Sequence, residues 1–150
     1  MKSMLLGLVA LGLSAGAAAA QSWEAVSVSE TAVMAVDWST LRINGGTRRV
    51  TVAVVASRPT AGAAFDYGTS SLDIDCASPR YITVSSKFFN IDGTRAADDY
   101  AGDGSWEAIN AGAMLEDVRA EVCASTASRP GFFDNVQVFA VNVRNVVAQE

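Results

Sequence analysis

Asp73 and Asp75 are the two side chains whose types and spacing best suit acid–base chemistry. A pair of carboxylates can act as general acid and general base when burial raises the pKa of one of them. The segment Leu72–Cys76, however, alternates apolar and acidic residues, which is typical of a strand with one face in water. We therefore expect Asp73 and Asp75 to be solvated surface charges rather than a catalytic pair.

Other kinds of catalytic or metal site lack a necessary residue. The chain contains no histidine, which excludes Ser–His and Cys–His nucleophiles and zinc sites built on histidine. Ser105 lies in Gly-Asp-Gly-Ser-Trp, which is not the Gly-x-Ser-x-Gly nucleophile elbow. Residues 99–104 partly resemble a calcium loop, but Ala101 and Asn110 are not the residues that such a loop requires. We predict no catalytic residue, no cofactor and no metal ligand.

Residues 1–20 have the pattern of a cleavable export signal. Lys2 precedes an apolar stretch, and the Ala-Ala-Ala sequence that ends at Ala20 suits signal peptidase. No later stretch approaches the roughly 20 apolar residues of a membrane-spanning helix, and no cysteine follows the signal as a site for a lipid. We expect the exported protein to begin at Gln21, to form one domain over residues 21–150, and to be periplasmic or secreted.

Both cysteines, Cys76 and Cys123, lie in the part expected to be exported. An even number of cysteines in an oxidising compartment is most simply explained by a disulfide bond. Such a bond would stabilise the fold by roughly 4 kcal/mol through loop-closure entropy. Two free thiols, one of them reactive, are the alternative, but the chain offers neither a histidine nor a CxxC motif to activate them.

Charge and aromatic residues indicate the kind of partner. The formal net charge of −5, which becomes −6 once Lys2 is removed, disfavours nucleic acids and anionic lipid surfaces. A predicted hairpin is flanked by three basic residues, Arg42, Arg48 and Arg49. This basic patch is either solvated charge or a binding site for an anionic partner. Trp38 lies at the end of a predicted element, where a tryptophan either fills the core or anchors a protein interface. These four residues are the candidate partner surface.

Strands are predicted over the first two thirds of this domain. Valines alternate on both faces of residues 50–55, which is typical of a central strand. Asp37–Leu41 breaks the preceding alternation and looks like a short turn whose aspartate caps it, and Asn44-Gly45-Gly46 is a reversal signal. Further strands are predicted at Leu72–Cys76 and Tyr81–Phe89, and the tight turns indicate antiparallel pairing.

Two helices are predicted near the end of the chain. Apolar residues recur at helical spacing over Ala113–Cys123, with Asn110 placed to cap them. A second stripe lies within residues 132–149, after Asp134 as the expected cap. Its valines would also suit a strand, but only a helix separates its polar from its apolar residues. The pattern predicts an α+β fold, with an antiparallel β-sheet and one or two C-terminal helices packed against it.

Several short motifs follow one another along the chain. Trp23 comes soon after the signal, followed by Val36-Asp-Trp-Ser-Thr-Leu-Arg42 and a valine-rich strand. The later motifs are Ile74-Asp-Cys76, Tyr81, Asp92-Gly93, Trp106-Glu-Ala-Ile109 and Val122-Cys123. Their order and spacing over residues 23–123 resemble the surface-adhesin protein E-like family, with residues 132–149 as a helical extension.

The resemblance implies a small exported bacterial domain, with an antiparallel sheet, a helix against it and a disulfide between Cys76 and Cys123. The family takes its name from an outer-surface lipoprotein that binds host matrix proteins, and a homodimer is compatible with it. None of the motif positions is a known catalytic residue. This chain differs from the family in lacking the lipid-anchor cysteine, in carrying the bulky Trp38, and in its longer loop over residues 58–69.

Two classes of function remain open. The first is a non-catalytic binding or envelope-accessory protein whose ligand is a protein. The second is an envelope enzyme that uses carboxylates, or an inhibitor of an envelope hydrolase. Two carboxylates in a deep pocket would favour the enzyme, whereas a shallow surface with exposed aromatic residues would favour the binding protein.

Overall fold

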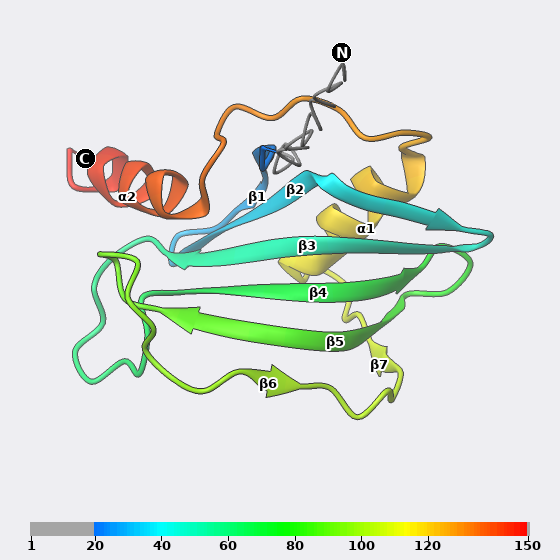
Figure 1. Cartoon of the computed structure of the whole chain (residues 1–150), viewed down its shortest axis with the longest axis horizontal. Helices are drawn as coiled ribbons and strands as arrows, with labels where there is room; N and C mark the ends of the chain where they lie inside the picture. Colours follow the sequence, from blue (N-terminus) through cyan, green and yellow to red (C-terminus); the bar gives the residue numbers. More distant parts are fainter. Residues whose placement is uncertain (1–19, 150) are drawn as a thin grey trace, which may run out of the picture.

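A computed structural model of the protein describes residues 20–149 (Figure 1). Its elements are β1 (Trp23–Val28), β2 (Ala32–Asn44), β3 (Thr47–Ala56), β4 (Tyr67–Asp75), β5 (Arg80–Phe89), β6 (Tyr100–Ala101), β7 (Glu107–Ala108), α1 (Met114–Ala124) and α2 (Val136–Val147). The export signal expected in residues 1–20 lies, apart from Ala20, outside the described residues. Within residues 20–149, no helix is long and apolar enough to cross a membrane.

The seven strands form one antiparallel sheet in the order β1-β2-β3-β4-β5-β6, with β7 also paired to β5. Both helices follow the sheet in the chain, so the predicted α+β class is confirmed. The valine-rich strand β3 lies inside the sheet, as its two apolar faces indicated. Val50 on one face and Val55 on the other are both 0% exposed.

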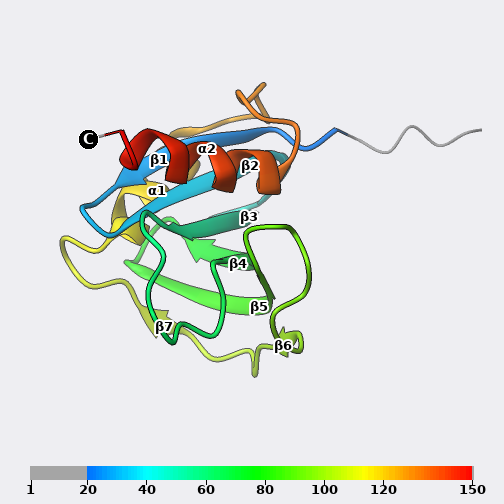
Figure 2. The same cartoon turned by 90° about the vertical axis from the view of Figure 1, so that its left-hand side faces the viewer.

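The two helices cover opposite faces of the sheet. Successive residues of a strand point to opposite faces. Strand β3 therefore contributes side chains to two separate hydrophobic cores, one on each face of the sheet. Val52 belongs to the core that includes Val118 of α1, whereas Ala53 belongs to the core that includes Phe139 of α2. Figure 1 shows α1 behind the middle of the sheet and α2 at the end away from the β2–β3 turn, and Figure 2 looks at that end. The face that carries α2 is therefore left open toward the turn.

The segment Asp37–Leu41, expected to be a turn or a single helical turn, is an irregular part of β2. Asp37 pairs with Thr51 and Arg42 pairs with Arg49, so β2 carries three more residues than β3 between these two pairs. The alternation breaks where the sequence indicated, but the chain forms a large bulge and stays in the sheet.

Side-chain hydrogen bonds hold this bulge in place. Thr40 Oγ1 donates to the carbonyl oxygen of Asp37 at 2.7 Å and accepts from the N–H of Thr51 at 2.8 Å. Asp37 Oδ1 accepts from the N–H of Ser39 at 3.1 Å and from its hydroxyl at 2.6 Å. These side chains replace the backbone pairing that the extra residues interrupt, so the strand can continue on the other side.

Both predicted helices are present, but both predicted caps are wrong. The N-cap of α1 is Ala113, which provides no side-chain hydrogen bond, and Asn110 lies three residues too early to act as cap. The N-cap of α2 is Asn135 rather than Asp134, because α2 starts one residue later than the pattern suggested. Asn135 Oδ1 accepts from the N–H groups of Gln137 and Val138 at 2.8 and 3.2 Å.

Candidate functional site

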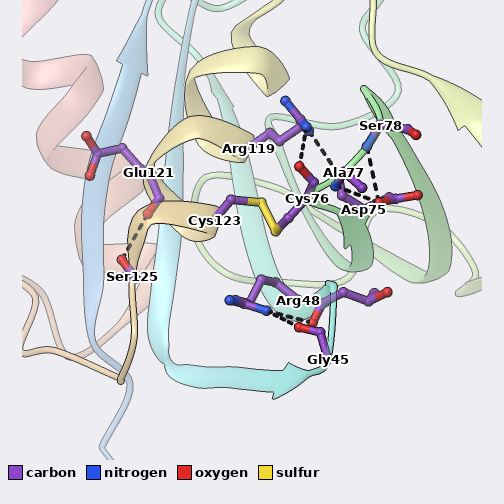
Figure 3. The surroundings of a disulfide bond; sticks show 11 residues. Gly45, Arg48, Asp75, Cys76, Ala77, Ser78, Arg119, Glu121, Cys123 and Ser125 are labelled. Carbon is purple, nitrogen blue, oxygen red and sulfur yellow. Dashed lines mark hydrogen bonds between the residues drawn. A yellow bond between two sulfur atoms is a disulfide. The ribbon is translucent and has the colours of Figure 1, made fainter.

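Cys76 and Cys123 form a disulfide bond with their Cα atoms 5.5 Å apart, which confirms the expected pairing (Figure 3). Cys76 directly follows β4, and Cys123 lies in the last turn of α1. Arg119 supports the same junction, because its guanidinium donates to the carbonyl oxygens of Asp75 at 2.8 Å and of Cys76 at 2.7 Å. The disulfide and Arg119 together fix α1 to the end of β4.

The two candidate catalytic carboxylates are each bound by a different arginine. Asp73 accepts from Nε and Nη2 of Arg49 at 2.7 and 2.6 Å, and Asp75 accepts from Nε of Arg80 at 2.8 Å. The Arg80 hydrogen bond, helped by the N–H of Ala77, holds the pKa of Asp75 below its ordinary value. The expectation of free solvation is wrong, because each carboxylate is held by its own arginine. A carboxyl group with a lowered pKa is a poor general acid.

The other carboxyl groups with shifted pKa values move in the same direction. Burial alone would raise the pKa of Asp66, but hydrogen bonds from Arg144 and from the N–H of Ile91 bring it below its usual value. The Thr94 hydroxyl lowers the pKa of Asp92, and the N–H of Ser105 lowers the pKa of Asp103. In the described part of the chain, no cluster of three or more potential ligand residues is placed to hold a metal ion.

The sheet separates the three arginines of the candidate partner surface. Arg42 and Arg49 are direct partners on β2 and β3 and share the open face, whereas Arg48 pairs with Ile43 and lies on the α1 face. Figure 3 shows Arg48 beside the β2–β3 turn, where its Nη1 donates to the carbonyl oxygen of Gly45 at 2.8 Å. The structure therefore brings together two of the three predicted basic residues.

Trp38 is a core residue, so its expected place on the partner surface is wrong. It is 0% exposed and packs in the core beneath α1. Its Nε1 donates to Glu24 Oε2 at 2.6 Å, and the guanidinium of Arg129 lies over its ring. Trp38 continues the alternation of Val36 and faces α1, whereas the three extra residues of the bulge place Arg42 on the opposite face.

Three rows of polar side chains cross the part of the sheet that α2 leaves uncovered. The strand register sets the rows, since directly paired residues lie on one face. We call this set the open face, and its rows are Arg42, Arg49 and Asp73; then Asp37, Thr51, Ser71 and Ser85; then Thr69 and Lys87. It contains two residues of the predicted patch and one of the two predicted carboxylates.

A groove of about 340 Å³ lies over the second and third rows, between the sheet and the start of α2. We call it the polar groove, and its walls include Asp37, Thr40, Thr51, Thr69, Ser71, Ser85 and Lys87. This groove was not predicted from the sequence, although the hydroxyl residues Tyr67, Thr69 and Ser71 occupy alternate positions of β4. That repetition was the available signal, whereas the contribution of Thr40 depends on the bulge and had none.

A second, larger groove of about 780 Å³ separates α2 from the β1–β2 turn. Its walls are mainly apolar and include Val28, Phe133, Phe139, Val143 and Val146. Val28 and Val146 are 73% and 62% exposed, so the apolar surface here is partly open to water. This groove lies at the opposite end of the molecule from the arginine row.

A family model described as Surface-adhesin protein E matches residues 23–124, more than half of the chain. The chain belongs to the surface-adhesin protein E family. The part of the chain that matches the family runs from β1 to the end of α1 and includes both cysteines and all the strands of the open face. Helix α2 lies outside the matched residues. No curated protein and no solved structure matches the chain. Family and disulfide together indicate an adhesin-like protein of the envelope or the cell exterior.

Proposed function

We propose that the protein is an exported, non-catalytic binding domain that recognises a protein partner with the arginine row of its open face. Membership of an adhesin family supports a binding role. The proposal also includes removal of residues 1–20 and release of a single domain that begins at Gln21 into the periplasm or the medium. The partner is a protein, in keeping with a chain whose net charge of −5 disfavours nucleic acids.

The observation that best supports the proposal is that Arg42 is exposed and held in place without a salt-bridge partner in residues 20–149. Its side chain is exposed, and its Nη1 donates to the carbonyl oxygens of Ser39 at 3.1 Å and Leu41 at 2.9 Å. No carboxylate of residues 20–149 lies within salt-bridge distance of it, whereas its neighbour Arg49 is paired with Asp73. A charged group that is held in place and exposed can bind a partner carboxylate with little further loss of side-chain entropy, and arginine is common at the centre of interfaces.

The enzymatic alternative has less support. Both aspartates that could have formed a catalytic pair are held by arginines, and the shifted carboxyl pKa values in residues 20–149 lie below their ordinary values. An inhibitor of an envelope hydrolase would still be a protein-binding domain. The identity of the partner, once found, separates an inhibitor from an adhesin.

Partner binding by matched variants tests the proposal. The purified exported protein is passed over immobilised extracellular-matrix proteins and, separately, over periplasmic extract. Arg42→Gln should lower the amount of partner captured several-fold, while Arg58→Gln, which removes an exposed charge at the large groove and outside the open face, should not. Equal capture by wild type and Arg42→Gln would contradict the assignment of the arginine row, and hydrolysis of a captured protein or glycan would contradict a non-catalytic role.

A further inference from the structure

Asp37 gives the polar groove a feature that an ordinary solvated sheet face lacks. It lines the groove although it is only 2% exposed. Its Oδ1 accepts from the N–H of Ser22 at 2.8 Å and from both donors of Ser39, whereas Oδ2 accepts from no group of residues 20–149. This oxygen keeps contact with the solvent of the groove, so it is available to accept from a bound molecule.

Lys87 stands on the other side of the same groove. It lies on β5 with an exposed side chain, and no carboxylate of the described residues is within salt-bridge distance of it. Thr51, Ser71 and Ser85 continue the row of Asp37 across the sheet as far as β5, the strand that carries Lys87. Hydroxyl groups both donate and accept, so this floor can pair with the N–H and C=O groups of a peptide backbone. The groove thus has an acceptor at one end, a donor at the other and neutral partners between.

We propose that the polar groove binds a zwitterionic peptide of two or three residues, with its α-ammonium on Asp37 Oδ2 and its carboxylate on Lys87. Asp37 and Lys87 are three strand spacings apart across the sheet, about 14 Å, and one row apart along the strands, about 7 Å, so their backbones are roughly 16 Å apart. An extended peptide adds roughly 3.5 Å per residue, and each charged hydrogen bond adds about 2.8 Å. Two or three residues bridge this distance, whereas a single amino acid is too short.

Two observations disfavour other small polar ligands. A sugar ring is usually held against the open face of an aromatic side chain, but Trp23 in this groove is 1% exposed and Phe89 is stacked on Tyr67 with centroids 5.1 Å apart. A simple anion would use Lys87 and leave Asp37 Oδ2 without a donor. This inference goes beyond the proposed function, because it assigns a small ligand to the polar groove, whereas the proposed function rests on a protein partner and the arginine row.

Titration with simple probes tests the inference on the exported protein. Triglycine is titrated by calorimetry and by amide chemical shifts, together with N-acetyl-triglycine, triglycinamide and maltose. We expect saturable binding of triglycine with shifts at Thr51 and Ser71, and roughly tenfold weaker binding when either terminus is blocked. The absence of saturable triglycine binding, equal affinity for the blocked peptides, or binding of maltose in place of triglycine would each overturn the inference.

Three variants assign the two ends. Lys87→Gln should weaken triglycine binding roughly tenfold while leaving the affinity for triglycinamide nearly unchanged. Asp37→Asn keeps an oxygen for the bulge but turns the other oxygen into a donor, and should weaken triglycine while sparing N-acetyl-triglycine. Arg58→Gln is the charge control and should bind like wild type. If Asp37→Asn fails to fold, Lys87→Gln still decides, because an unchanged affinity for triglycine in that variant contradicts the proposal.

Discussion

The guanidinium of Arg129 lies 3.9 Å from the centroid of the Trp38 indole ring. Both side chains also donate to one acceptor, Glu24 Oε2, at 2.9 Å from Arg129 Nε and 2.6 Å from Trp38 Nε1. The three residues join β1, the bulge of β2 and the connection from α1 to α2. This cluster explains why a tryptophan that looked suited to an interface serves the core.

Trp38→Phe should therefore affect stability and not partner binding. The phenyl ring keeps part of the packing but loses the hydrogen bond to a charged acceptor, which costs about 1.5–3 kcal/mol. Urea unfolding measures the loss. Trp106→Phe is the control, since Trp106 is 42% exposed and should change the unfolding free energy much less. A folded Trp38→Phe protein with wild-type stability would contradict the role assigned to the cluster.

Removal of the disulfide should lower stability strongly. The double variant Cys76→Ser, Cys123→Ser loses the covalent link between β4 and α1, and should unfold with a free energy roughly 2–5 kcal/mol below that of wild type. Arg119 still holds the two elements in place, so the folded form should remain detectable at low temperature. Two reactive thiols per chain in the denatured wild-type protein would contradict the premise.

Acid should destabilise the protein in part through Asp75. Its pKa in the folded state lies below the unfolded value of about 3.9. The ionised form therefore stabilises the fold at higher pH, and this contribution is lost as the pH falls from about 4 through the lower, folded-state pKa. As the pH is lowered from about 6 to about 2, the urea concentration at the unfolding midpoint should decrease less for Asp75→Asn than for wild type. Identical slopes would show that the Arg80 contact does not shift Asp75.

The bulge of β2 should depend on a single hydroxyl. Thr40→Val keeps the shape of the side chain but leaves the Thr51 N–H without its acceptor, which costs about 1–3 kcal/mol. Thr60→Val, in an exposed loop, makes the same chemical change and should be nearly neutral. Thermal or urea unfolding of the two variants side by side measures the difference. Equal stability of the two variants would show that the bulge does not need Thr40.

Most of the fold could be predicted from the periodic spacing of apolar residues and from turn residues that are close together in the chain. The alternation of residues 50–55, the Gly45–Gly46 reversal and the helical spacing over Ala113–Cys123 each depend on neighbours in the chain, and all three appear as expected. Gly45 has a φ of +58°, which explains the glycine at the turn. Helix caps were harder to predict from the sequence. If the start of α2 is misplaced by one residue, Asp134 is taken as the N-cap in place of Asn135.

Interactions between distant residues could not be read from the sequence. The bulge needs the N–H of Thr51 on the next strand, and the burial of Trp38 needs Arg129, far along the chain. The polar groove likewise depends on strand register, which decides that Asp37, Ser71 and Ser85 share one row. The sequence indicated the arginines of the hairpin, but only the pairing of Arg42 with Arg49 shows which of them share a face.

Acylation of Lys87 tests most directly whether the open face is the binding surface. Lys87 is the one lysine of the chain besides Lys2, so an amine-reactive reagent reports on this face alone once the terminal amine is counted separately. An interface of ordinary size covers about 800 Å² on each partner, enough to span all three rows. Mass spectrometry of the protein with a captured partner should show acylation of Lys87 slowed several-fold relative to the free protein, and an unchanged rate in the saturated complex would contradict binding through the open face.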